Sequence, residues 1–180
     1  MKKTIIYCGL IAGAIVASWM VLAMSGCFYD PEFEGSMLMG YTSMLVAFSM
    51  IFVGVKNARD KYNDGMISFG KAFKIGLMIA LIGSTIYVVV WMIDYYFFMP
   101  DFFERYSAKM LARMKASGAS QAELQKQIID SQNSGKLYRK PIFCALFTYM
   151  EILPVGIIVA LVCALILKRK PKADNVMLTT

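Results

Sequence analysis

Long apolar stretches alternate with short polar ones along most of this chain. Residues 4–29, 35–55 and 75–93 carry no formal charge, and residues 141–167 carry a single one, at Glu151. With about 1.5 Å of rise per residue, roughly 20 helical residues cross a hydrocarbon core about 30 Å thick. Each stretch is long enough to do this. The pattern therefore predicts an all-α, polytopic membrane protein with four transmembrane helices.

The predicted spans cover about residues 4–24, 36–55, 72–99 and 142–167. Together they take up about half of the chain and leave no room for a separate globular domain. We therefore expect one four-span membrane domain over residues 1–170, followed by a flexible cytoplasmic tail over residues 171–180.

The connection between the third and fourth spans, residues 100–140, is also expected to be helical. Four apolar residues recur there at helical spacing, and basic residues occupy much of the remaining surface. The apolar residues are Phe103, Tyr106, Met110 and Met114. This pattern predicts an amphipathic helix on the outer leaflet. The capping-box pattern Ser120-x-x-Glu123 predicts the start of a second short helix, which the polar stretch 131–135 is expected to end.

Aromatic residues crowd the same side of the predicted protein, as an interfacial belt would require. They are Tyr95, Tyr96, Phe97, Phe98, Phe102, Phe103, Phe143 and Phe147.

Composition and charge fit a membrane protein and set its predicted orientation. Hydrophobic residues make up 58% of the chain, and the mean hydropathy is +0.57. The net charge of +7 comes from basic residues near the span ends, so it argues for lipid headgroups and against nucleic acid. Eleven of the 19 Lys and Arg residues lie at the N-terminus, in the second connection and in the tail. The positive-inside rule therefore predicts that both termini are cytoplasmic and that residues 100–140 lie outside.

The N-terminus has an alternative interpretation. The run Met24-Ser25-Gly26-Cys27 looks like a lipoprotein signal that ends at a lipidated cysteine. However, the apolar region before Cys27 is longer than the roughly 7–15 residues of a cleaved signal. Gly9 and Gly13 also form the small-xxx-small pattern of a permanent helix that packs closely on a neighbour. A retained first span is therefore the favoured interpretation.

The third span concentrates small and polar residues on one helical face. The residues are Gly76, Ala80, Ser84, Tyr87, Trp91 and Asp94, with Gly83 at the border. The small residues are expected to let another helix approach closely. The polar ones either satisfy each other within a packing face or line a cavity for a ligand.

The fourth span carries an acid and a proline close together. Glu151 lies well inside the apolar run, where an ionisable residue costs about 2.5 kcal/mol or more. Pro154 has no backbone N–H, so a kink or a broken turn is expected beside Glu151. Thr148 shares a face with Glu151 and is expected to hydrogen-bond its carboxyl group. Glu151, with Asp94 at a similar depth, is either a proton or cation site or a structural acid held by hydrogen bonds.

No cofactor or metal is expected. Histidine is absent, and no cysteine pair has the spacing of metal ligands. The four cysteines are expected to be small core residues, and a disulfide between Cys27 and Cys144 is the lesser alternative.

Several motifs resemble a bacterial membrane family known as domain of unknown function 4199. They are the stretch Ile67-Ser68-Phe69-Gly70-Lys71-Ala72-Phe73-Lys74-Ile75-Gly76, the stretch Glu151-Ile152-Leu153-Pro154-Val155-Gly156, and the exit Ala164-Leu165-Ile166-Leu167-Lys168. The resemblance extends over about residues 1–170. It implies a four-span inner-membrane protein of Gram-negative bacteria, chiefly of the Bacteroidetes type, without an established activity.

Two classes of function remain open. The first is a non-enzymatic structural or accessory helix-bundle component, whose partners are the lipid bilayer and either further copies of the chain or another membrane protein. The second is a small oligomeric carrier or channel that uses Glu151 and Asp94. Four spans are few for a carrier, so that function would require a homo-oligomer. No catalytic motif is present, and an enzyme is not expected.

Overall fold

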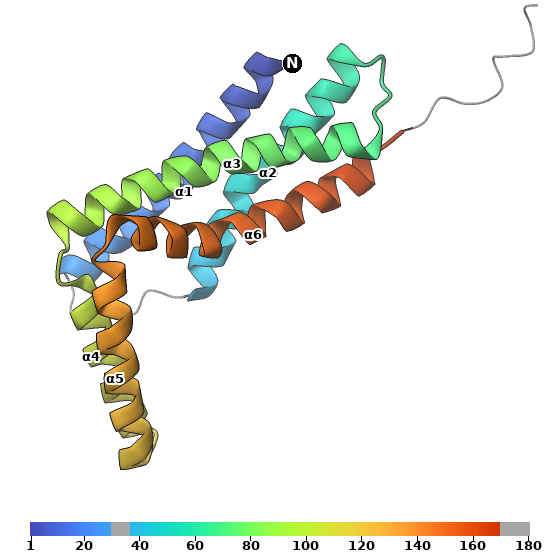
Figure 1. Cartoon of the computed structure of the whole chain (residues 1–180). Coiled ribbons are helices and arrows are strands. Elements are labelled where there is room, and N and C mark those ends of the chain that lie inside the picture. Colours follow the sequence, from blue (N-terminus) through green and yellow to red (C-terminus); the bar gives the residue numbers. More distant parts are fainter. Residues whose placement is uncertain (30–36, 170–180) are drawn as a thin grey trace, which may run out of the picture. The chain divides into compact units, whose positions relative to one another are not determined.

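The computed structural model describes residues 1–29 and 37–169, and every named element in that part of the chain is helical (Figure 1). The elements are α1 (Lys2–Tyr29), α2 (Met37–Tyr62), α3 (Phe69–Ile93), the π-helix η1 (Asp94–Phe98), α4 (Phe102–Ala116), α5 (Gln121–Tyr138) and α6 (Pro141–Leu167). The prediction of an all-α protein is confirmed.

Four of these helices are long and apolar enough to cross a membrane. The segments are Lys2–Met24, Leu38–Tyr62, Phe69–Phe98 and Pro141–Leu167. The prediction of four membrane-spanning helices is confirmed, and the chain is an integral membrane protein. The second helix continues past its predicted end at residue 55, because no helix-breaking residue interrupts its basic last two turns before Asn63.

A tight turn joins α2 to α3, where Asn63, Asp64 and Gly65 are residue types that favour turns. The side chain of Asn63 donates a hydrogen bond to the Ala58 carbonyl at 2.7 Å. Asp64 and Gly65 then adopt positive φ angles of 48° and 77°, which end the helix. Ser68 accepts a hydrogen bond from the backbone N–H of Lys71 at 3.4 Å and so acts as the N-cap of α3.

Helices α4 and α5 form an antiparallel hairpin. Gly118 adopts a φ of +81°, and the N–H of Ala119 donates to the Met114 carbonyl at 3.0 Å, so α4 ends in a Schellman motif. The predicted capping box at the start of α5 is confirmed. Ser120 accepts from the N–H of Glu123, and the Glu123 carboxylate accepts from the N–H of Ser120 at 2.8 Å. These hydrogen bonds lower the pKa of Glu123.

The prediction that residues 131–135 end the second short helix is wrong. Helix α5 continues through this polar stretch to Tyr138. The reason is packing, because a β-carbon at Gly135 would lie 3.1 Å from the ring of Phe103. Ser131, Ser134 and Gly135 lie on the side of α5 that approaches α4, so tertiary contacts override the weak helix propensity of this stretch.

The described chain divides into two compact units, Met1–Tyr87 with Glu151–Thr180, and Val88–Met150. In the first unit, α3 packs through small residues against the other three long helices. Gly13 of α1 lies against Ile86, Gly54 of α2 against Ile79, and Gly76 against Ala160 of α6. Close approach of this kind maximises van der Waals contact, which stabilises helix pairs in lipid.

A short main-chain link also holds the first unit together. Ile67 and Arg169 form an antiparallel bridge, in which the N–H of Arg169 donates to the Ile67 carbonyl at 2.9 Å. It ties the end of α6 to the turn before α3.

Two predictions fall outside the described residues or side chains. They concern lipidation or disulfide formation at Cys27 and the flexible tail over residues 171–180. Of the described cysteines, Cys8, Cys144 and Cys163 are free and buried.

Candidate functional site

The second unit centres on a hydrogen bond between two aromatic side chains far apart in the sequence. Trp91, near the end of α3, donates its indole N–H to the hydroxyl of Tyr138, the last residue of α5, at 2.6 Å. The ring of Tyr138 also packs against the rings of Tyr95, Phe103 and Phe147, with centroid distances of 5.2, 5.7 and 6.2 Å. This cluster joins α3, η1, α4, α5 and α6 within the unit.

The hydroxyl of Tyr138 has further polar neighbours on α6. Thr148 and Cys144 lie close enough to the hydroxyl to affect its pKa, whereas Trp91 donates the hydrogen bond to it. Burial nevertheless dominates and raises the pKa of Tyr138 to about 12. The hydroxyl group is therefore neutral at physiological pH and acts as a hydrogen-bonding node rather than as a base.

Thr148 has a different acceptor from the one the sequence predicts. Its side chain is buried, and its hydroxyl donates to the Cys144 carbonyl at 2.8 Å. The hydrogen bond that the sequence predicts from Thr148 to the Glu151 carboxyl group is therefore donated to a backbone carbonyl one turn earlier in α6. This arrangement is common for threonine in membrane helices.

A π-helix follows Trp91. The N–H of Met99 donates to the Asp94 carbonyl at 2.9 Å, five residues back, and the wider turn buries Tyr95 to 2% exposure. Tyr95 therefore belongs to the aromatic cluster instead of the predicted interfacial belt, whereas Phe97 and Phe98 are exposed. One carboxylate oxygen of Asp94, Oδ2, is buried without a hydrogen-bond partner among the described residues. π-Helical turns of this kind are frequent at functional sites.

Two further contacts tie the end of α5 to its neighbours. The Tyr96 hydroxyl donates to the Arg139 carbonyl at 3.0 Å. The guanidinium of Arg139 forms an ion pair with Glu104 of α4. Both charged side chains are half-exposed or more, so the pair contributes at most about 1 kcal/mol.

In the first unit, Glu151 lies on the outward face of α6. Its side chain is exposed, as are those of Pro154, Ile158, Leu161 and Leu165. The opposite face is buried in the unit and includes Ile152, Gly156, Ala160, Cys163 and Leu167. The intramembrane acid therefore has no helix of this unit over it.

Pro154 lies within α6, and the helix is continuous from Pro141 to Leu167. Its turn is not broken. The predicted kink remains a prediction.

The small residues singled out from the sequence lie at helix contacts of the first unit. A β-carbon at Gly9 or Gly13 of α1 would lie 2.7 Å from the β-carbons of Ile82 or Ile86 of α3. Gly83 faces Ala12 and Phe48, while Gly76 and Ala80 face α6.

Ser84 is fully buried, and its hydroxyl has no partner among the described residues. Tyr87 is buried as well, at 9% exposure.

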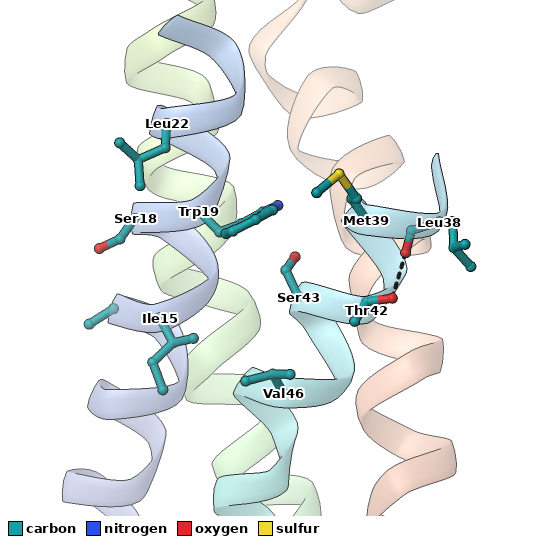
Figure 2. A pocket seen from close by; sticks show the side chains of 10 residues that line it. Ile15, Ser18, Trp19, Leu22, Leu38, Met39, Thr42, Ser43 and Val46 are labelled. Atoms are coloured by element: carbon teal, nitrogen blue, oxygen red, sulfur yellow. Dashed lines mark hydrogen bonds between the residues drawn. The ribbon is translucent and has the colours of Figure 1, made fainter. Parts of the chain in front are cut away.

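An apolar groove of about 650 Å³ runs between α1 and α2 (Figure 2). Trp19 of α1 points toward Met39 of α2 across it, and Ile15, Leu22 and Val46 also line the groove. The hydroxyls of Thr42 and Ser43 donate to carbonyls of their own helix at 2.7 Å, so they are not available to fix a ligand. Neither Glu151 nor Asp94 lines the groove.

The described residues contain no group of three or more His, Cys, Asp and Glu side chains that could hold a metal ion.

Sequence reasoning missed the residue at the centre of the second unit. Tyr138 lies at the end of a segment where the polar stretch 131–135 concealed the helix. The signal that was available is the run Leu137-Tyr138 directly before the basic pair and Pro141, which places an aromatic at the junction of two helices.

Comparison with known proteins gives a family and no activity. No curated protein and no solved structure matches the chain. A family model described as "Protein of unknown function (DUF4199)" matches residues 7–169. This range includes three of the membrane-spanning helices in full, the first from residue 7 onward, and most of both units. The chain therefore belongs to the DUF4199 family.

Proposed function

We propose that the protein is a non-enzymatic component of a membrane assembly, and that α6 docks it onto another transmembrane helix. The observation that carries this proposal is the outward position of Glu151. An acidic side chain at membrane depth faces protein or water in most membrane proteins. Because the face of α6 that carries Glu151 has no helix of its own unit over it, a partner helix supplies the missing contact.

The same geometry favours a role as a non-enzymatic assembly component and argues against a carrier that works as a single chain. A carrier binds its ion near the bilayer midplane, between its own helices. Here the acid faces outward, and the helix contacts of the first unit are filled by small and apolar side chains. Asp94, with its unpartnered carboxylate oxygen, lies in the second unit.

Photo-crosslinking in native membranes tests the proposal. A photoreactive amino acid in place of Ile158, which is 60% exposed, should give protein adducts whose partner peptides mass spectrometry identifies. The matched control replaces Leu45 of α2, which is 55% exposed and should give lipid adducts only. Lipid adducts alone at position 158, or proton or cation flux through vesicles that contain the purified chain, would contradict the proposal.

We further propose that the protein resides in a bacterial inner membrane with both termini in the cytoplasm. The basic residues of the second connection and the tail support this orientation through the positive-inside rule. A reporter that is active only in the periplasm should be active when fused at Gln121 and inactive when fused at Lys61. The reverse result would contradict the orientation, and activity at neither position would contradict an external third connection.

A further inference from the structure

We infer that the partner of α6 is α6 of a second copy of this chain, in a parallel two-fold pair in which the two Glu151 carboxyl groups meet. This inference rests on the proposed function and names the partner. It follows from the spacing of the outward residues, from the chemistry of the carboxyl group, and from the depth at which the acid lies.

The spacing of the outward residues is that of a paired helix. Glu151, Pro154, Ile158, Leu161 and Leu165 are exposed and follow steps of three, four, three and four residues. Alternating steps of this kind place a single seam of side chains along one side of a helix, and such seams interdigitate in left-handed helix pairs. Membrane helix bundles mostly adopt this crossing geometry.

The small-residue face of α6 is already in use. Gly156 lies against Ala80 and Phe48, and Ala160 lies against Gly76. Close small-residue packing therefore holds α6 inside its own chain. A second contact must use the larger, outward side chains.

Glu151 is the one polar residue of the outward seam. A protonated carboxyl group both donates and accepts hydrogen bonds, so it is complementary to a second carboxyl group. In a parallel pair with two-fold symmetry, each residue of the seam faces its own counterpart at the same depth. Two identical chains inserted in the same orientation therefore place their Glu151 carboxyl groups at the same depth. An unrelated helix would need a matching polar group at that depth. A single polar position in an apolar seam also fixes the register of a helix pair.

Cysteine crosslinking of the purified chain in lipid vesicles tests the pairing. The four native cysteines are replaced by alanine, and one cysteine is introduced at Ile158 or, in a second variant, at Leu165. A short bis-maleimide should join two copies through either position. Ile166 is the matched control, because it is 65% exposed but lies to the side of the seam. Leu45 controls for pairing through α2. Efficient crosslinking at Ile166 or Leu45 instead of Ile158 would overturn the inference.

The role of Glu151 is tested by two substitutions with opposite expectations. Glu151→Gln keeps a self-complementary donor and acceptor, so dimerisation measured by energy transfer between labelled chains should stay within about threefold of wild type. Glu151→Leu keeps the size but removes the hydrogen bonds, and dimerisation should weaken about ten-fold. Dimerisation that is unchanged in Glu151→Leu would overturn the assignment of the carboxyl pair.

The outcomes also separate this inference from the proposed function. If the purified chain is monomeric while position 158 is crosslinked to a different protein in native membranes, the second-copy partner is wrong and the assembly role stands. If position 158 meets only lipid in native membranes, both are wrong.

Discussion

Replacing Gly13 by alanine should destabilise the first unit by about 1–3 kcal/mol, the usual cost of overpacking a tight contact. The new β-carbon would lie 2.7 Å from the β-carbon of Ile86, which rotation of the isoleucine side chain cannot move away. The helices α1 and α3 must separate instead, and they lose van der Waals contact along their length. Gly9→Ala should behave alike, because its β-carbon would lie 2.7 Å from that of Ile82.

Gly40→Ala is the matched control for this prediction. It is the same substitution inside a membrane helix, but nothing lies within 4 Å of the added β-carbon. Alanine has the higher helix propensity, so this variant should be as stable as wild type or more stable. Thermal unfolding in detergent micelles, followed by circular dichroism, measures both variants. Equal unfolding temperatures for Gly13→Ala and Gly40→Ala would contradict the close contact of α1 with α3.

Removing the side chain of Tyr138 should have the largest effect in the second unit. Tyr138→Ala deletes the ring on which Tyr95, Phe103 and Phe147 pack, and because Tyr138 is only partly buried the cost should lie at the lower end of the about 3–5 kcal/mol seen for aromatic core residues. Tyr138→Phe keeps the ring but leaves the Trp91 indole N–H without its acceptor, at a cost of about 1–3 kcal/mol. The control is Tyr106→Phe, because Tyr106 is 57% exposed and its change should stay within about 0.5 kcal/mol.

The dependence of stability on alkaline pH provides a second test of the role of Tyr138. The pKa of Tyr138 is about 12 in the folded protein against an ordinary value of 10.0, because the neutral hydroxyl group is buried. The unfolded chain therefore loses this proton first as the pH rises. The contribution of Tyr138 to stability is present in full below pH 10 and falls between about pH 10 and 12. Hydrogen exchange of α5 amides should show a larger loss in the wild type than in Tyr138→Phe. A pH profile shared by both proteins would contradict the assignment.

The four spans were predictable because bilayer crossing imposes a length and a composition on each helix. The local signal at the Ser120–Glu123 capping box was equally reliable, because there each side chain satisfies a backbone N–H of the other residue. Both kinds of signal depend on neighbours within a few residues.

The long-range features could not be read from the sequence in the same way. The hydrogen bond from Trp91 to Tyr138 joins residues 47 positions apart, and no local pattern indicates it. The π-turn at Asp94 buries Tyr95, whereas regular helical spacing predicts that Asp94 lies on the packed face. The sequence singles out Glu151 as an acid inside an apolar span. Periodicity alone, however, does not distinguish a helix face that packs inside the chain from one that is exposed on the outside of the bundle.

The discontinuity of the first unit has a consequence for biosynthesis. Its first part ends at Tyr87, and its last part begins at Glu151, so the residues between them must be made before α6 can pack. At roughly 5–20 residues per second, this interval lasts roughly 3–13 s. During that time, α3 is already made, but the side of Gly76 that will meet Ala160 has no partner. A nascent chain in the membrane thus presents an open, close-packing helix face for seconds.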